Sequence, residues 1–272
     1  MLPEFKETTK FLLTLSEKAG KILLEYYSPA GVSFSEKENF SRVTEADLKV
    51  NRMVIEEVEK KYPDFKVHGE EESNDNEDSK KLFVVDPLDG TLMFTIGSPL
   101  FCFSAAVVLD GKSVAGVIYN PLAKRTLLAE EGKGTWLIEE NKKMSVSKKA
   151  DFDYAMINCG FRETELATLL QSLGARTPAV YAACEYASLV ATGGFDGALY
   201  LSHHAYDIAA AKIIIEEAGG KVTDIYGEDQ RYDKPLRGAL MSNGILHDEL
   251  IKLIEKGGTR ERLSTLDFNR EL

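Results

Sequence analysis

One segment constrains the fold of this chain more than any other. It is the apolar run at residues 82–85 together with the six residues that follow it directly: Asp86, Pro87, Leu88, Asp89, Gly90 and Thr91. Its β-branched and aromatic residues, followed by a proline, predict a buried strand. Two carboxylates then stand at the end of that strand, and Gly90 and Thr91 supply free backbone N–H groups where a helix could begin. Carboxylate oxygens suit Mg²⁺ and exposed N–H groups suit an anion. The segment therefore predicts a cation site beside a phosphate site.

Two other interpretations of this segment stay open at this point. Asp, Pro and Gly are ordinary turn residues, so a surface turn would also explain them. Residues 88–92 also resemble the aspartyl-phosphate motif of haloacid-dehalogenase-like phosphatases, but Pro87 stands where the nucleophilic aspartate would be. The three-residue spacing of Asp86 and Asp89 favours two carboxylates that share metal over a covalent aspartyl mechanism.

Length, charge and cysteine content limit the kinds of protein that this chain can be. Its 272 residues are enough for two compact domains or one large α/β unit. The net charge of −11 opposes binding to nucleic acid or to an anionic membrane. Neither a secretory signal at the start nor a long apolar span is recognisable. Three widely separated cysteines without a C-x-x-C pair predict a reduced, cytoplasmic protein.

Apolar spacing in the first half predicts two helices and an antiparallel sheet. The helices are expected at 5–26 and 44–62, before a short strand at 65–68 and a polar loop at 73–79. Further strands are expected at 101–109, 113–119, 125–129 and 135–138, with Asp110 and Gly111 as a hairpin turn. The polar, basic run at 141–151 predicts a boundary between an N-terminal α+β subdomain, 1–145, and a C-terminal α/β subdomain, 146–272.

The second half alternates strand and helix, which predicts a layered α/β arrangement. Strands are expected at 155–159, 221–223 and 239–241, and helices at 163–173, 182–192 and 206–218. Gly219 and Gly220 close the last helix in the usual way. The polar tail at 257–272 is expected to be loose.

Acidic residues at other junctions between loops and helices extend the candidate site. Asp47 and Asp207 each fall in the first turn of a predicted helix, and Glu70 and Glu71 follow a predicted strand. Singly, each has an ordinary explanation as a helix-dipole partner or as solvated surface charge. Together with Asp86 they indicate a functional site, since such junctions are where sites are built.

Four motifs resemble the inositol monophosphatase family, in that family's order and over most of the chain. They are VTEAD at 43–47, GEE at 69–71, DPLDGT at 86–91 and DIAA at 207–210, and the runs at 189–197 and 217–220 add to the likeness. The resemblance implies a layered α-β-α-β-α sandwich of the inositol monophosphatase and fructose-1,6-bisphosphatase type with two subdomains. It also implies a Mg²⁺-dependent hydrolase of phosphate monoesters that assembles as a homodimer.

The resemblance also implies roles for the metal-binding residues. Glu70, Asp86 and the carbonyl of Leu88 would hold one Mg²⁺. Asp86, Asp89 and Asp207 would hold a second, with Asp86 bridging the two. A third, weaker Mg²⁺ would lie near Glu70.

The remaining roles follow from the same resemblance. Thr91 and Asp47 would form a relay in which the Thr91 hydroxyl contacts the metal-activated water and Asp47 accepts a hydrogen bond from that hydroxyl. Backbone N–H groups of Gly90 and Thr91 would receive phosphate oxygens. Contacts with the substrate are expected at Asp89, Gly90, Thr91, Ala183 and Tyr200.

Departures from the family pattern bear on the substrate. Tyr206 replaces the usual Trp, and residues 181–183 replace a frequent Gly-Ser/Thr-Ala. Tyr200 stands where inositol-cleaving members carry a Glu that binds sugar hydroxyls, which counts against myo-inositol 1-phosphate as the main substrate. His203 and His204 could face the substrate or be polar surface.

The expected substrate is a small phosphorylated metabolite, either inositol monophosphate or a related polyol or sugar phosphate. Fructose 1,6-bisphosphate, histidinol phosphate and 3′-phosphoadenosine 5′-phosphate are alternatives on the same fold. A non-enzymatic alternative is a protein that binds a phosphate ligand but has lost catalysis. The intact carboxylates and the Thr91 hydroxyl argue against that alternative.

Overall fold

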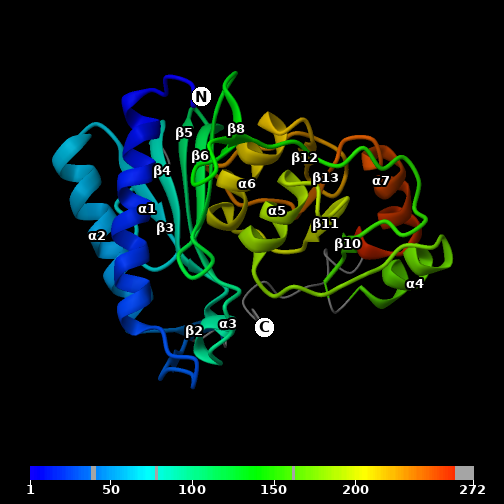
Figure 1. The fold of residues 1–272 in the computed structure, drawn as a ribbon, viewed down its shortest axis with the longest axis horizontal. Coiled ribbons are helices and arrows are strands. Elements are labelled where there is room, and N and C mark those ends of the chain that lie inside the picture. The colour runs from blue at the N-terminus through cyan, green and yellow to red at the C-terminus, as the bar shows by residue number, and fades with distance from the viewer. Residues whose placement is uncertain (38–40, 77–78, 161–162, 261–272) are drawn as a thin grey trace.

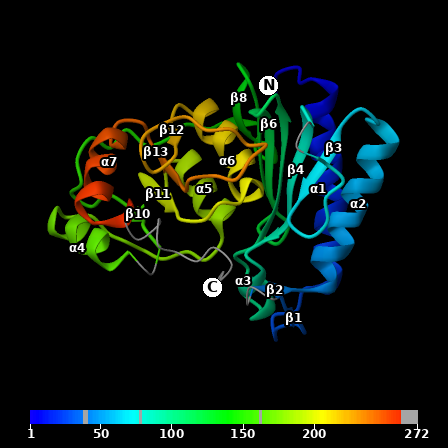
Figure 2. The ribbon, with the colours of Figure 1, turned by 180° about the vertical axis from the view of Figure 1, so that it is seen from behind.

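The computed structural model describes residues 1–37, 41–76, 79–160 and 163–260, and it stacks helices and sheets in alternating layers (Figure 1). Helices α1 (Glu7–Tyr26) and α2 (Glu45–Lys61) cover one face of a seven-stranded sheet. Helices α5 (Ala183–Ala191) and α6 (Ala205–Glu217) separate that sheet from a four-stranded one. Helices α4 (Thr164–Ser172) and α7 (His247–Lys256) lie on the far side, as the view from behind also shows (Figure 2). The predicted α-β-α-β-α layering is confirmed.

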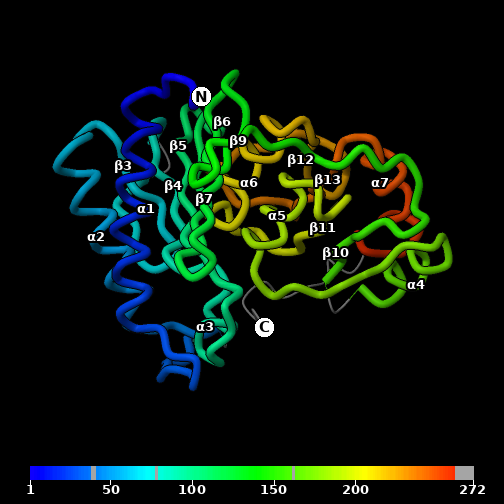
Figure 3. Tube along the Cα trace, in the orientation of Figure 1, coloured from blue at the N-terminus to red at the C-terminus, as the bar shows by residue number. Residues whose placement is uncertain are grey.

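The larger sheet follows the chain in simple order, as the Cα trace shows (Figure 3). Its strands are β3 (Lys66–Gly69), β4 (Lys81–Asp89), β5 (Cys102–Leu109), β6 (Lys112–Asn120), β7 (Arg125–Glu130), β8 (Gly134–Leu137) and β9 (Lys142–Lys143). Strands β3 and β4 run parallel, and each later neighbour pairs antiparallel. Asp110 and Gly111 form the predicted hairpin turn, both with positive φ (49° and 83°), as a tight two-residue connection requires.

The smaller sheet has the order β10-β11-β13-β12. Its strands are β10 (Ile157–Asn158), β11 (Gly197–Tyr200), β13 (Ala239–Ser242) and β12 (Lys221–Thr223). Two minor elements complete the fold: the pair β1 (Ser35–Glu36) and β2 (Arg42–Val43), and the one-turn helix α3 (Thr91–Thr95).

Most predicted elements are present, with some differences in extent. The strand predicted at 82–85 continues to Asp89, and the strand predicted at 155–159 is only two residues long. Elements β1, β2, β9, β11 and α7 have no predicted counterpart. Residues 77–78 of the predicted polar loop and 261–272 of the predicted tail lie outside the described residues.

Strand β4 is buried on both faces, which explains its uninterrupted apolar run. Phe83 and Val85 pack into the core beneath α1 and α2, whereas Leu82 and Val84 pack into the core beneath α5 and α6. The two cores alternate along the strand because successive side chains point to opposite faces. The apolar run ends at Asp86, and Leu88 beyond it is again fully buried in the core beneath α1 and α2.

Helix α6 lies between the two sheets, and most of its residues are buried. The Ser113 hydroxyl of β6 donates a hydrogen bond to the carbonyl of Ala209 (2.6 Å), which fixes the helix on the sheet. At Gly116 a Cβ atom would lie 2.8 Å from Ile213 and 3.0 Å from Ala210, so β6 has a glycine where α6 packs closely against it. This docking sets the position of Asp207 in the first turn of the helix.

No described helix is long and apolar enough to span a membrane.

Candidate metal-dependent active site

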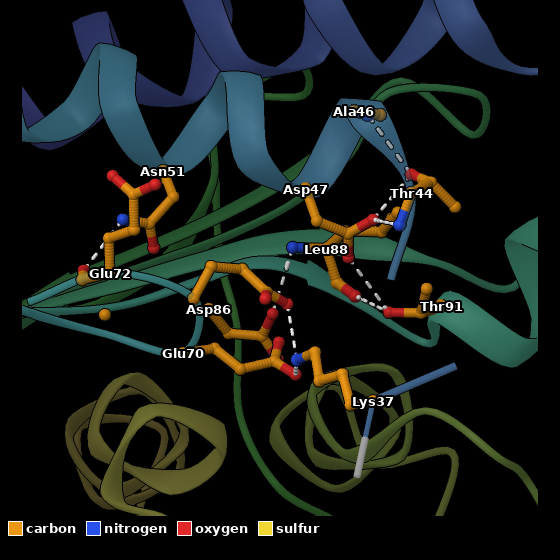
Figure 4. Close-up of polar contacts among 12 residues, drawn as sticks. Lys37, Thr44, Ala46, Asp47, Asn51, Glu70, Glu72, Asp86, Leu88 and Thr91 are labelled. Atoms are coloured by element: carbon orange, nitrogen blue, oxygen red, sulfur yellow. Dashed lines mark hydrogen bonds and ion pairs between the residues drawn. The ribbon is translucent and has the colours of Figure 1, made fainter. Parts of the chain in front are cut away.

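The predicted site residues meet where strands β3 and β4 end and helices α2 and α6 begin. Glu70 directly follows β3, and its backbone N–H donates to the carbonyl of Val85 on β4 (3.1 Å). Because β3 and β4 are parallel, their carboxyl ends lie at the same edge of the sheet and bring Glu70 beside Asp86. Figure 4 shows these carboxylates gathered below the first turn of α2, which carries Asp47.

Asp86, Asp89 and Asp207 form the first carboxylate cluster. One oxygen from each of the three lies within 4.8 Å of the others. Asp86 and Asp89 are only 2% and 5% exposed. Removal from water raises the pKa of Asp86 well above its usual range, and the charges of Glu70, Asp207 and Asp89 raise it further. Burial likewise raises the pKa of Asp89 to about 7. Three such carboxylates are far more favourable beside a divalent cation than beside one another.

The loop between Asp86 and Thr91 is held by its own hydrogen bonds. Asp86 Oδ1 accepts a hydrogen bond from the Leu88 N–H (2.9 Å), and the Leu88 carbonyl accepts one from the Thr91 hydroxyl (2.9 Å). Pro87 has no N–H to donate, and it falls in the irregularity of the β4–β5 ladder between Asp86 and Asp89. The turn therefore brings carboxylate and carbonyl oxygens together, which is the donor set that Mg²⁺ prefers.

Asp47, Glu70 and Glu71 form a second cluster, again with oxygens within 4.8 Å of one another. The ammonium group of Lys37 lies against it, 2.8 Å from Glu70 and 2.6 Å from Glu71. Burial lowers the pKa of Lys37, but the two glutamates outweigh burial and hold the pKa above its usual value. A side-chain cation thus already sits at this cluster (Figure 4), which indicates that the local field attracts positive charge.

Asp47 joins helix α2 to the loop after β4. Its Oδ2 accepts a hydrogen bond from the N–H of Thr44 (2.8 Å) and another from the Thr44 hydroxyl, in a capping box at the start of the helix. Its Oδ1 accepts the Thr91 hydroxyl (3.1 Å). Asp47 is fully buried, and burial raises its pKa to about 6 despite the hydrogen bonds from Thr44. The capping box orients the carboxylate so that one oxygen faces Thr91.

Gly90 forms the corner between β4 and α3 and has a left-handed backbone, with φ of 84°. A Cβ atom at this position would lie 2.8 Å from the carbonyl of Leu100 and 3.0 Å from Ala182. Among the described residues, neither the Gly90 nor the Thr91 N–H has an acceptor. The corner therefore presents two N–H donors beside the carboxylates, as the sequence predicts.

Asp89 is also held by the second half of the chain. Its two oxygens accept hydrogen bonds from the N–H groups of Ala183 (2.8 Å) and Cys184 (2.9 Å) at the start of α5. Ala183 was predicted to touch the substrate, and this N–H contact gives it a role in orienting Asp89. The sequence alone contains no sign of the contact, because residues 89 and 183 meet only in the folded chain.

Tyr200 lies at the end of β11, 8% exposed, and its hydroxyl donates a hydrogen bond to Asp207 Oδ2. A contact between Tyr200 and substrate stays a prediction, but the hydroxyl is already engaged by a predicted metal ligand. Nearby, the ring of Tyr206 stacks on His204, with centroids 4.8 Å apart. Burial lowers the pKa of His204 to about 4, so this ring is neutral at physiological pH.

Taken together, the residues fit divalent cations. Carboxylate oxygens from Asp86, Asp89 and Asp207 converge, with Glu70 and the Leu88 carbonyl in the adjoining loops. Burial raises the pKa of each of the three aspartates, and their mutual repulsion adds to it, so this cluster lacks compensating charge of its own. A hydroxyl, Thr91, and a buried carboxylate, Asp47, stand beside them. The sequence did not single out Lys37, because a lysine in an irregular segment carries no signal of the contact it makes.

Comparison with known proteins gives a consistent result. The sequence pattern of the inositol monophosphatase family matches residues 4–259. The chain is 30% identical over 250 residues to the fructose-1,6-bisphosphatase/inositol-1-monophosphatase of Thermotoga maritima, covering 90% of this chain and 95% of that protein. It is 28% identical over 236 residues to the Nus factor SuhB of Xylella fastidiosa, covering 82% and 84% of the two chains. The solved structure of a Thermotoga maritima IMPase superposes with a TM-score of 0.83 at 28% identity, covering 95% of this chain and all (100%) of that one.

Proposed function

This chain belongs to the inositol monophosphatase family of metal-dependent phosphomonoesterases, and we propose that it hydrolyses a small polyol or sugar phosphate with Mg²⁺. One observation carries the proposal. Asp86 and Asp89 from the first half and Asp207 from the second converge within 4.8 Å, beside the hydrogen-bonded pair of Thr91 and Asp47. Such an arrangement suits hydrolysis assisted by metal rather than a covalent phosphoenzyme.

We assign the metal ligands as the resemblance implied. Glu70, Asp86 and the Leu88 carbonyl would hold one Mg²⁺, and Asp86, Asp89 and Asp207 a second. Bound there, Mg²⁺ would supply positive charge to the phosphate and lower the pKa of a coordinated water. A third ion near Glu70 would compete with the ammonium group of Lys37 for the same glutamates.

Asp47 and Thr91 would accept the proton that the attacking water loses. The Thr91 hydroxyl has one hydrogen, which it shares between Asp47 and the Leu88 carbonyl. When the hydroxyl accepts a proton from the attacking water, it can pass its own to Asp47, whose raised pKa makes it a competent base near neutral pH. The N–H groups of Gly90 and Thr91 would meanwhile donate to the phosphate oxygens, as anion sites in loops commonly do.

The substrate class follows from the rim of the site rather than from its metal ligands. Tyr200 replaces a glutamate that would bind sugar hydroxyls, and its own hydroxyl is directed to Asp207. Fructose 1,6-bisphosphate joins inositol monophosphate as a candidate, since the Thermotoga maritima relative is named for both activities. We propose that the substrate is inositol monophosphate or a related polyol or sugar phosphate, with Tyr200 counting against myo-inositol 1-phosphate as the main one.

The first experiment tests the chemistry. Hydrolysis of a generic phosphate ester is measured with and without Mg²⁺ in the unaltered protein, in Asp89→Asn and in Asp64→Asn. Asp64 is an exposed acid paired with Lys81, so it controls for the loss of one negative charge. We expect activity that needs Mg²⁺ and that is lost only in Asp89→Asn. Activity that ignores both Mg²⁺ and Asp89 would rule out the proposal.

A second experiment tests the substrate. Inositol 1-phosphate, fructose 1,6-bisphosphate, histidinol phosphate and 3′-phosphoadenosine 5′-phosphate are compared by kcat/KM under identical Mg²⁺ concentrations. A large preference for inositol 1-phosphate would show that Tyr200 does not disfavour it.

We also propose a cytoplasmic homodimer with subdomains divided at residues 145 and 146. The cysteines are free, which suits a reducing compartment. Exposed apolar side chains of Leu92, Ile96 and Leu100, just after the site, would be covered in a dimer. Sedimentation at micromolar concentration measures the oligomeric state directly.

A further inference from the structure

Two cysteines lie beside Asp89. Cys102 is at the start of β5 and Cys184 is in the first turn of α5, and both are buried and free. Their Sγ atoms and one oxygen of Asp89 all lie within 4.8 Å of one another. None of the three roles assigned above, in metal binding, proton transfer or phosphate binding, uses either thiol.

The spacing of these atoms matches a tetrahedral metal site. With metal–sulfur and metal–oxygen bonds of about 2.3 and 2.0 Å, a tetrahedral ion places sulfur and oxygen about 3.5 Å apart and two sulfurs about 3.8 Å apart. Cys102 Sγ lies 3.5 Å from Asp89 Oδ2. The distances from Cys184 Sγ to Cys102 Sγ and to the Asp89 oxygen are both within 4.8 Å, so they would need to shorten by at most about 1.3 Å to reach the tetrahedral values.

A fourth polar group points to the same place. Ser104 lies two residues after Cys102 on β5, so the two side chains share the face that packs against α5. It is completely buried. Burial raises the pKa of the Cys184 thiol, and the neighbouring Ser104 hydroxyl lowers it, so the hydroxyl lies beside that sulfur. A metal–thiolate centre would offer the hydroxyl a charged acceptor in place of a neutral thiol.

We infer that Cys102, Cys184 and Asp89, with Ser104 beside them, form a binding site for a thiophilic divalent cation such as Zn²⁺ or Cd²⁺. Binding would form two metal–sulfur bonds and release the two thiol protons to solvent, with no change in oxidation state. Two thiolates and one carboxylate are a set that favours Zn²⁺ or Cd²⁺ over Mg²⁺, which prefers oxygen ligands throughout.

The proposed site shares Asp89 with the predicted Mg²⁺ cluster. An ion held by the two sulfurs would draw Asp89 Oδ2 towards β5 and away from Asp86 and Asp207. It would therefore inhibit Mg²⁺-dependent hydrolysis without occupying the phosphate position. This inhibitory consequence rests on the proposed function, whereas the binding site itself does not.

A redox role for the same pair is less favourable. Burial raises the pKa of Cys184 to about 11 and that of Cys102 well above its usual value, so little thiolate is available to attack an oxidant. A bound dication supplies the positive charge that a buried thiolate otherwise lacks.

Cadmium is the probe for the test, because it gives an ultraviolet charge-transfer absorption when thiolates bind it. Metal-stripped protein is titrated with Cd²⁺ in excess Mg²⁺ and without substrate. The unaltered protein is compared with Cys102→Ala, Cys184→Ala, Cys102→Ser and Cys159→Ala. Cys159 is a buried cysteine in the separate core around α4 and α7, so it is the matched control.

We expect saturation at one Cd²⁺ per chain in the unaltered protein and in Cys159→Ala. Cys102→Ala and Cys184→Ala should each weaken Cd²⁺ binding at least about tenfold. Removal of a group that only hydrogen-bonds to a metal ligand already has an effect of about this size. No charge-transfer band in the unaltered protein would overturn the inference, whether or not the variants fold. A band of equal affinity in Cys102→Ala and Cys184→Ala would overturn it as well.

Activity measurements on the same proteins distinguish the existence of the binding site from its inhibitory role. If Cd²⁺ inhibits the unaltered protein and Cys159→Ala at concentrations that spare Cys102→Ala, both the site and its inhibitory role are supported. If the charge-transfer band appears but Cd²⁺ does not inhibit hydrolysis, the binding site is supported and its inhibitory role is refuted. A protein that hydrolyses no phosphate ester refutes the proposed function, while the spectrum still decides the cadmium site.

Discussion

Replacing Tyr200 with phenylalanine should weaken Mg²⁺ binding more than substrate binding. The change removes one hydroxyl and keeps the ring, which is 8% exposed at the end of β11. That hydroxyl donates a hydrogen bond to Asp207 Oδ2. Without the donor, the Asp207 carboxylate loses a contact that restrains its rotation beside Asp86 and Asp89.

Two effects of the substitution oppose each other. Loss of the hydrogen bond leaves more negative charge on Asp207, which favours a cation. It also leaves a buried acceptor unpaired and a ligand free to rotate. Hydrogen bonds to charged groups contribute about 1.5–3 kcal/mol, and removal of such partners typically lowers metal affinity about 10–100-fold. Because about 1.4 kcal/mol corresponds to a factor of ten, these two ranges agree, and we expect loss of orientation to dominate.

The assay is the Mg²⁺ concentration for half-maximal activity, measured at saturating substrate. We expect it to rise about 10–100-fold in Tyr200→Phe, with a smaller change in substrate KM at saturating Mg²⁺. Tyr232→Phe is the matched control, because Tyr232 is 1% exposed and among the described residues its hydroxyl has no hydrogen-bond partner. The reasoning is refuted if the Mg²⁺ requirement is unchanged while KM rises, since Tyr200 would then act on the substrate alone.

Three further predictions follow from the site. Asp47→Asn should lower kcat at least about 100-fold at saturating Mg²⁺, because asparagine accepts the Thr91 hydrogen bond but cannot take its proton; an unchanged kcat would remove Asp47 from the mechanism. With a chelator present, thermal stability should fall as the pH rises from about 4 to about 7, since burial raises the folded-state pKa of Asp89 to about 7 and ionisation then opposes folding. Added Mg²⁺ should therefore raise Tm more at pH 8 than at pH 5, and an equal rise at both would contradict this. Gly90→Ala should lower the free energy of unfolding, measured by chemical denaturation, by about 1–3 kcal/mol and should also reduce activity. The φ of Gly90 is 84°, and a Cβ atom there would lie 2.8 Å from the Leu100 carbonyl. Gly132→Ala is the control and should destabilise less, because Gly132 also has a positive φ but has open space around it.

Periodicity predicted much of the architecture because burial in this fold is regular. Helices α1 and α2 each bury one stripe, and the strands of the larger sheet alternate between two cores. Strand β11 was missed because Gly197 and Ala198 carry little strand signal, and because it pairs with β13, which comes much later in the chain, as in Gly197 with Ser242. Helix α7 has no predicted counterpart, although Leu246, Leu250 and Ile254 recur every four residues and are all buried.

Local motifs identified the carboxylates, but not the groups that orient them. Asp86 and Asp89 belong to one turn, and their closeness follows from the chain itself. The N–H of Cys184, the Tyr200 hydroxyl and the ammonium group of Lys37 reach the carboxylates only through tertiary packing. Those contacts depend on where α5, β11 and the segment around Lys37 are placed, which no short-range pattern encodes.

The docking of α6 on β6 has a consequence for how this protein could change over evolutionary time. Gly116 and Ser113 lie far from the carboxylates in sequence, yet they hold the helix that carries Asp207. A substitution that shifted α6 along the sheet would leave every ligand in the chain and still separate Asp207 from Asp86. Loss of activity in a descendant would therefore not require loss of any ligand. Retention of activity therefore depends on Gly116 and Ser113 at this contact as well as on the carboxylate ligands.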